Sequence, residues 1–123
     1  MCRILLSINP EHVEHIFDGS KQYEFRKTKC KEDVDGIVIY STAPVKQVVA
    51  EADVEEILED SPNRIWKITK QKSGISKEFF FKYYSGRAKA VAYKLTNLNV
   101  FETPRELADY GVSTPPQSFV YVH

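Results

Sequence analysis

Cysteine is scarce in this sequence of 123 residues, which has only Cys2 and Cys30 and no CxxC pair. This scarcity argues against a disulfide framework and a cysteine-rich zinc site, and it favours free thiols in a reducing compartment. Long apolar runs are also missing. No stretch approaches the roughly 18 residues of a membrane-spanning helix, and the N-terminal apolar run is too short for a signal peptide. We therefore expect a cytoplasmic protein with no membrane partner.

The sequence also lacks a net charge, because 17 Lys and Arg residues balance 17 Asp and Glu residues. Neutrality argues against a domain that coats nucleic acid, since such domains are usually basic. The charges are nevertheless segregated: residues 21–31 carry a net charge of +4, residues 51–60 a net charge of −6 and residues 64–94 a net charge of +8. This distribution allows a basic surface on a neutral protein. The alternative is that the blocks neutralise one another across the surface.

The length and composition predict one globular domain over residues 1–123. Alternating or apolar runs predict strands at residues 3–8, 21–27, 36–42, 46–58, 88–96 and 118–122. Capping residues predict short helices that begin after Asn9, Ser61, Ser76 and Thr103. Strands and helices do not alternate regularly, which disfavours a doubly wound parallel sheet. We expect an α+β fold, a small mixed or antiparallel β-barrel of about five or six strands with short inserted helices.

The segment from Gly19 to Arg26, GSKQYEFR, has the form GxKxxExR and runs from the end of a short helix into a strand. Together with ILLSINP at residues 4–10, this motif resembles the ASCH domain of the PUA-like superfamily. Further blocks resemble the small ASCH group described as predicted regulators: residues 40–46, the run from Ile57 through the helix of Trp66, and residues 115–119. The resemblance covers nearly the whole chain and implies a PUA-like β-barrel with a cleft beside the motif strand.

Domains similar to this one bind RNA or modified nucleobases, and some are described as ribonucleases or as hydrolases of acylated cytidine nucleosides. The resemblance implies that Lys21, Glu24 and Arg26 line the cleft. Amidohydrolase members have a threonine three residues after the lysine of the motif, whereas this chain has Glu24. The change removes a hydroxyl group and adds a negative charge, which argues against a direct transfer of that mechanism.

The chemistry of the motif residues allows more than one role. Lys21 is a candidate phosphate contact or, if desolvation lowers its pKa, a catalytic base or nucleophile. A solvated surface lysine is the alternative. Strict alternation sets Lys21 opposite Glu24, so a shared cleft needs a twist or bulge between them. Glu24 and Arg26 can order a pocket in which Arg26 contacts a phosphate or a base, or they can form a purely structural ion pair.

Other polar positions are weaker candidates for ligand binding. Ser7, Tyr40 and Ser41 can supply hydroxyl contacts, and Tyr40 can also offer a stacking face or simply pack in the core. Gln117 and Ser118 follow a Pro-Pro loop and can read a base edge, or can serve only to close the barrel.

Glu51 lies in an apolar run, where an inward carboxylate needs a partner. It is a candidate partner of Lys21 or a general base, unless it faces outward. His12 and His15 lie three residues apart with no third ligand near them in the sequence, so we expect no metal and no cofactor. The aromatic residues at positions 79, 80, 83 and 84 have helical spacing and are expected to pack in the core.

The leading hypothesis is a module that binds RNA or a modified nucleotide in a cleft lined by the GxKxxExR strand. Such a module can have a regulatory role. The alternative is an enzyme, either a hydrolase of acylated cytidine nucleosides or a ribonuclease. In that case Lys21 acts as base or nucleophile, and Glu24 or Glu51 is its proton partner. A third hypothesis is a protein-interaction domain whose cleft is empty.

Overall fold

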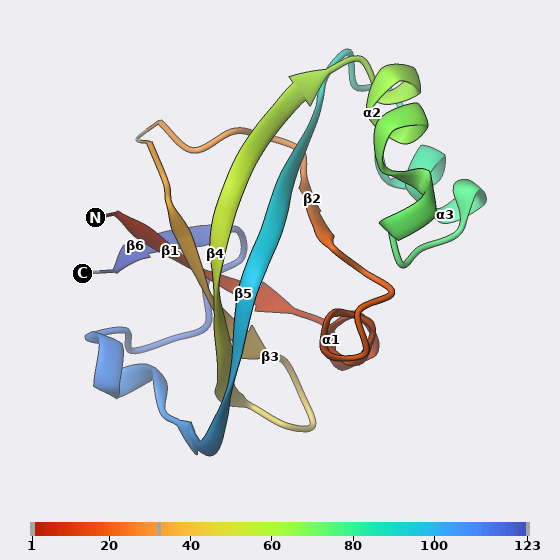
Figure 1. Cartoon of the computed structure of the whole chain (residues 1–123). Helices are drawn as coiled ribbons and strands as arrows, with labels where there is room; N and C mark the ends of the chain where they lie inside the picture. The colour runs from red at the N-terminus through yellow and green to blue at the C-terminus, as the bar shows by residue number, and fades with distance from the viewer. Residues whose placement is uncertain (1, 32, 123) are drawn as a thin grey trace.

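A computed structural model describes residues 2–31 and 33–122, and in it six strands form one sheet (Figure 1). The strands are β1 Arg3–Ile8, β2 Tyr23–Arg26, β3 Gly36–Ser41, β4 Gln47–Asp60, β5 Ala90–Arg105 and β6 Phe119–Val122. The α-helices are α1 Pro10–Phe17, α2 Pro62–Thr69 and α3 Lys77–Tyr83, and the 3₁₀ helices are η1 Lys70–Lys72 and η2 Leu107–Tyr110. None of the helices in this part of the chain is both long enough and apolar enough to cross a membrane.

The sheet is mixed and has the strand order β2-β5-β4-β3-β1-β6. β1 runs parallel to β3, and the other neighbouring pairs are antiparallel. β4 and β5 form a long central ribbon whose pairing shifts register at three places, and such irregularities bend a sheet. The sheet curls into a half-barrel, which confirms the expected α+β class and barrel-type sheet.

The core is divided among the two faces of the sheet and the helical end of the ribbon. One cluster joins alternate residues of β1 and β3 to Val13 and Ile16 of α1. A second cluster joins β2 to α2 and α3 around Ile65 and Phe80, both fully buried. In Figure 1, α2 and α3 lie at one end of the β4–β5 ribbon, and β2 lies on the side of the ribbon nearest α3 and α1.

Three of the predicted helix starts are confirmed. The side chains of Asn9, Ser61 and Ser76 cap α1, α2 and α3 by accepting backbone N–H bonds from the first turn of each helix. The expected helix start at Thr103 is wrong. β5 continues to Arg105, which still pairs with Val48 of β4, and the capping box of η2 is formed by residues 106 and 109. Continued pairing with β4 thus outweighed the local capping signal.

Candidate functional site

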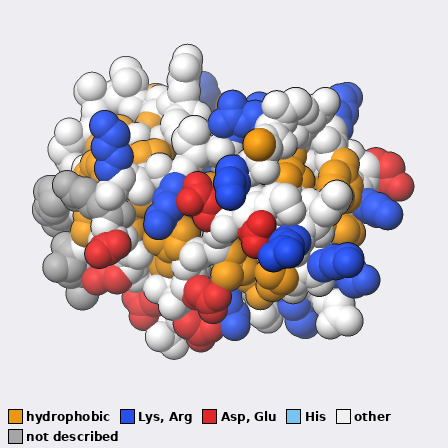
Figure 2. All heavy atoms as spheres, turned by 90° about the horizontal axis from the view of Figure 1, so that it is seen from above, with side chains coloured by type: hydrophobic (Ala, Val, Ile, Leu, Met, Phe, Trp, Pro, Cys, Tyr) orange, Lys and Arg blue, Asp and Glu red, His pale blue; other side chains and the backbone are white. Residues whose placement is uncertain are grey.

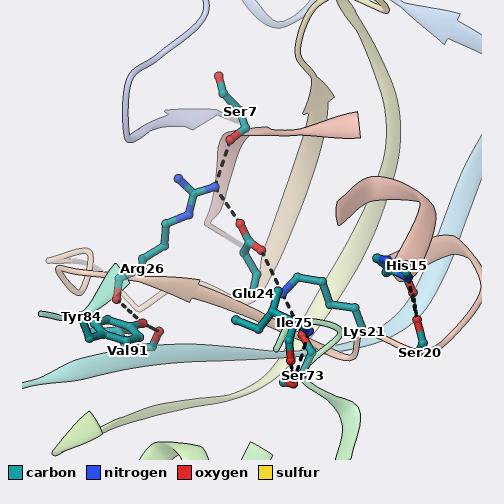
Figure 3. A network of polar contacts seen from close by, with 10 residues as sticks. All are labelled: Ser7, His15, Ser20, Lys21, Glu24, Arg26, Ser73, Ile75, Tyr84 and Val91. Carbon is teal, nitrogen blue, oxygen red and sulfur yellow. Dashed lines mark hydrogen bonds and ion pairs between the residues drawn. The ribbon is translucent and has the colours of Figure 1, made fainter. Parts of the chain in front are cut away.

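Lys21 is carried into the interior by the turn between α1 and β2. It lies before β2, in an isolated bridge with Ser73, so its direction does not follow the alternation of the strand. Its backbone N–H donates to the carbonyl oxygen of His15 at 2.9 Å. Its Nζ donates to the carbonyl oxygen of Ser73 at 3.0 Å (Figure 3), and the residue is only 3% exposed. The bridge therefore supplies the twist that Lys21 needs to share a cleft with Glu24.

Glu24 lies between two cations. Its Oε2 accepts a hydrogen bond from Nη2 of Arg26 at 2.8 Å, and its Oε1 lies 3.9 Å from Nζ of Lys21. Nη2 of Arg26 also donates to the carbonyl oxygen of Ser7 in β1 at 3.1 Å. Figure 3 shows the resulting chain of contacts from Ser7 to Ser73. The structure thus brings the three motif residues and Ser7 together.

Burial has the largest effect on the pKa of Lys21. Desolvation lowers this pKa below its ordinary value, the Glu24 carboxylate opposes that effect, and the Arg26 guanidinium adds to it. Nζ also lies 4.7 Å from the centre of the Phe25 ring, a distance at which the ring attracts the cation. A lysine with a lowered pKa gives up its proton more easily, which a base or a nucleophile requires.

A pocket of about 150 Å³ opens beside this network, between β1, α1, β2 and α3. Its lining residues are Ser7, Ile8, Asn9, His12, Lys21, Glu24, Phe25, Arg26, Ile75, Phe79 and Tyr83. Two of the lining residues each have a buried polar atom, Nδ1 of His12 and Nε of Arg26, with no hydrogen-bond partner within the described residues. Burial lowers the pKa of His12, and the charge of Lys21 lowers it further, so the imidazole is neutral at pH 7.

Several lining residues were not predicted as site residues from the sequence. The expectation that all four aromatic residues of the α3 segment pack in the core is correct for Phe80 and Tyr84, which are buried. Tyr83 is partly buried against the same cluster and also lines the pocket, whereas Phe79, one helical turn before it, is half exposed and lines the pocket. Their i, i+4 spacing was the available signal, because it separates them from the buried pair on a helix. His12 gave no signal beyond its position on the first helix.

Other predicted site residues lie outside the pocket. Tyr40 and Ser41 are buried in β3, where Tyr40 packs in an apolar cluster with Leu5 and Phe101. Gln117 and Ser118 are exposed in the loop before β6 and do not line the pocket. This loop nevertheless touches the site, because the Ser7 hydroxyl donates to the carbonyl oxygen of Pro116 at 2.8 Å.

The structure places Glu51 away from Lys21 and agrees with the alternative in which Glu51 faces outward. Glu51 lies in β4 and forms an ion pair with Arg3 of β1, and it also accepts a hydrogen bond from Asn99 at 3.4 Å. Because Glu51 faces these partners at the surface, Glu24 is the carboxylate that neighbours Lys21.

Among the described residues, no three His, Cys, Asp or Glu side chains lie close enough together to hold a metal ion. The two histidines of α1 differ in their nearest contacts. His12 lines the pocket, whereas Nδ1 of His15 lies 3.2 Å from the Ser20 hydroxyl.

Residues 2–114 match the family described as "Domain of unknown function (DUF365)". A protein of Ureaplasma parvum named large ribosomal subunit protein uL22 is 31% identical over 97% of this chain, which spans only 39% of that relative's length. A protein of Zymomonas mobilis named ASCH domain-containing ribonuclease is 28% identical over 96% of this chain and 82% of its own length. A crystal structure of ASCH from Zymomonas mobilis superposes with a TM-score of 0.88, at 28% identity, over 98% of this chain and 87% of that one.

Proposed function

The chain belongs to the family described as domain of unknown function DUF365 and has an ASCH fold, and on this basis we propose that it binds RNA. One base of the RNA occupies the pocket beside Lys21, Glu24 and Arg26. The protein binds the RNA without changing it chemically, as a regulatory module does.

The two unpartnered polar atoms of the pocket carry this proposal. A buried polar atom without a hydrogen bond costs about 1–3 kcal/mol, and both Nε of Arg26 and Nδ1 of His12 are in that state. Each atom belongs to a residue that lines the pocket, so a ligand that enters with a small shift of these side chains can bond to them and offset this cost. The pocket of about 150 Å³ matches an engineered cavity of about 150 Å³ that holds benzene, so its size suits a single ring.

The charge and the aromatic lining support a nucleobase as the ligand. Lys21 and Arg26 outnumber Glu24, so the three together carry one net positive charge and offer mainly hydrogen-bond donors. Nucleobases present carbonyl oxygens and ring nitrogens as acceptors. Tyr83 lines the same pocket and carries an aromatic ring, on which unstacked bases of single-stranded RNA stack. The Zymomonas relative's name, a ribonuclease, also concerns RNA.

The proposal is tested by Arg26→Lys, which keeps the charge but removes Nε and the fork of donors. We expect a fluorescently labelled single-stranded RNA to bind about tenfold more weakly to this variant, as for the loss of one charge-assisted hydrogen bond. Arg64→Lys is the matched control, because the side chain of Arg64 is 75% exposed on α2. Both variants are first checked for folding by circular dichroism. Equal affinity of the two variants, or no binding by the unchanged protein, would overturn the proposal.

A second candidate function is RNA cleavage, favoured by the 28% identity to the relative named as a ribonuclease. His12 is neutral at pH 7 and can accept a proton, and the lowered pKa of Lys21 makes its ammonium group a better proton donor. In such a reaction the base takes the proton of the 2′-hydroxyl, and the 2′-oxygen attacks phosphorus. The bond from phosphorus to the 5′-oxygen then breaks, and that oxygen takes a proton, leaving a cyclic phosphate and a 5′-hydroxyl.

Cleavage and binding are separated by incubating end-labelled RNA with the protein and analysing the products on a gel. Intact RNA that stays bound supports the binding module. Cleavage that is lost in Lys21→Met, in a variant shown to be folded, supports the ribonuclease. N4-acetylcytidine is assayed beside the RNA, because the alternative of an acylated-cytidine hydrolase predicts release of acetate and cytidine.

A further inference from the structure

A wider groove adjoins the pocket on the outer side of α1. Its volume is about 650 Å³, and it runs between α1 with the turn that follows it and the segment from η1 to α3. Four residues line both the groove and the pocket: Asn9, His12, Ile75 and Phe79. Because the two hollows share this rim, a chain that leaves the pocket past His12 enters the groove directly.

Phe79 offers a ring at the shared rim. It is 48% exposed, although its neighbour Phe80 is fully buried and fixes α3 against the core. The Phe79 ring meets the edge of the His12 ring with centroids 5.5 Å apart and planes at 67°. Such a contact holds the phenyl ring in place between two helices. An exposed, fixed aromatic ring beside a base-sized pocket is suited to stacking a second base.

The walls of the groove differ in charge. Lys70 lines the wall formed by η1, and Lys72 and Lys77 follow it along the chain, whereas Glu11 and His15 line the opposite wall. Figure 2 shows that Lys and Arg side chains gather on the side of the molecule where α2 and α3 lie. A phosphate in the groove is therefore attracted to the η1 wall and repelled by the wall of α1.

We propose that this groove is a second nucleotide subsite, so that the protein recognises two consecutive nucleotides of single-stranded RNA. The first base occupies the pocket, the second stacks on Phe79, and the phosphate between them lies against Lys70. The inference rests on the proposed RNA binding and adds to it the length and the path of the RNA segment that is held.

The test compares the nucleosides cytidine and uridine, which lack a phosphate, with the dinucleotides CpC and UpU in calorimetric titrations of the full chain. We expect the better dinucleotide to bind about tenfold more tightly than its nucleoside, as for the stacking of one base on an aromatic ring. Lys70→Gln should reduce this gain severalfold and leave the nucleoside affinity unchanged, because Lys70 lines only the groove. Lys67→Gln is the matched control, since Lys67 is exposed on α2 and lines neither hollow.

A second variant, Phe79→Leu, keeps an apolar side chain at the rim and removes the ring, and it should abolish most of the dinucleotide gain. Nucleosides that bind in an Arg26-dependent way, with dinucleotides that bind no more tightly, would overturn the groove subsite alone. A gain that survives in both Lys70→Gln and Phe79→Leu would also overturn it. If neither nucleosides nor dinucleotides bind, the proposed function itself fails.

Discussion

At Glu24, one carboxylate pairs with two cations, Lys21, which is buried, and Arg26, which is partly buried. The side chains of Lys21, Glu24 and Arg26 are 2%, 8% and 15% exposed, so each charge depends on its partners rather than on water. Removing a charge from water costs free energy, and close contacts with opposite charges must offset that cost. Glu24 supplies them through one oxygen for each cation, which leaves the other donors of Arg26 for a ligand.

The first prediction concerns this carboxylate. Glu24→Gln keeps the shape of the side chain and removes its charge, which leaves Lys21 and Arg26 without an anion. We expect a loss of about 3 kcal/mol in the free energy of unfolding, typical of a broken buried ion pair. Urea denaturation measures the loss. Glu55→Gln is the matched control, because Glu55 pairs with Lys94 at 2.8 Å near the surface, and its loss should be much smaller. Equal losses in the two variants would contradict the role assigned to Glu24.

The second prediction follows from the lowered pKa of Lys21. The unfolded chain holds this proton up to the ordinary pKa of 10.5, whereas the folded chain releases it at lower pH. The unfolded state therefore binds more protons in the interval between the two pKa values, and the Lys21 contribution to stability rises with pH across it. Lys21→Met should lack this rise.

Urea denaturation between about pH 7 and about pH 10 measures this effect as a difference between the unchanged protein and the variant. The difference removes the contributions of the tyrosines that both proteins share. Lys67→Met, at an exposed position of α2, serves as the control and should keep the rise. A stability difference that stays constant across this interval would refute the prediction.

At the scale of elements, the turn before α3 is shaped to accept Lys21. Gly74 has φ +68°, and a Cβ at this position would lie 2.4 Å from Cβ of Lys21 and 3.0 Å from its Cα. The contact includes backbone atoms, so rotation of the lysine side chain cannot relieve it. Glycine is thus required both by the backbone angle and by the close approach of the two segments.

The third prediction separates these two requirements. Gly74→Ala should lower the free energy of unfolding by about 3 kcal/mol, from the left-handed backbone and the overlap together. Gly86→Ala is the control, because Gly86 has φ +77° but no atom lies within 4 Å of the position that its Cβ would take, and it should lose about 1 kcal/mol. Thermal unfolding of both variants provides the measurement. A Gly86 variant as unstable as the Gly74 variant would show that the backbone angle alone matters.

Local signals predicted most of the elements, and pairing decided the rest. The strands and the caps at Asn9, Ser61 and Ser76 depend on neighbouring residues in the sequence, so their patterns were sufficient. The length of β5 depends on its pairing with β4, which no local pattern contains. The capping signal at Thr103 was overridden for that reason.

The candidate site was predictable only in part for the same reason. The motif marked Lys21, Glu24 and Arg26, but their burial depends on Ser73 and Gly74, which are distant in the sequence. His12 and Phe79 meet only in the packed fold, where α1 and α3 line the same pocket. An aromatic residue on a short helix has the same sequence pattern whether it faces a core or a pocket, so its role required the packed structure.

At the scale of the whole molecule, the net charge is zero, but only some of the acidic and basic side chains pair with one another. Three acids of the block at residues 51–60 pair with basic residues: Glu51 with Arg3, Glu55 with Lys94 and Asp60 with Arg64. At these positions the acidic block and basic residues therefore neutralise each other across the surface. In the described part of the chain, lysines between α2 and β5 such as Lys70 have no ion pair of this kind. The basic side visible in Figure 2 thus remains available to an anionic partner.

The fourth prediction is the salt dependence of RNA binding, which reports how much of that basic side the RNA covers. Each phosphate neutralised on single-stranded nucleic acid contributes about −0.7 to the slope of log K against log salt concentration. A strand held by the pocket and the groove brings about two phosphates to the protein, which gives a slope of about −1.4. Contact along the whole basic side, with about five phosphates, would give a slope of about −3.5.

Fluorescence anisotropy of one labelled single-stranded RNA, titrated at several KCl concentrations, distinguishes these slopes. We expect the shallow slope, because a neutral protein attracts the polyanion only where its charges are locally unbalanced. Lys70→Gln should reduce the slope by about 0.7, the value for one phosphate contact, whereas Lys67→Gln should leave it unchanged. A slope near −3.5, about the value for contact along the whole basic side, that does not change in Lys70→Gln would mean that the RNA follows the basic surface instead of entering the pocket and groove.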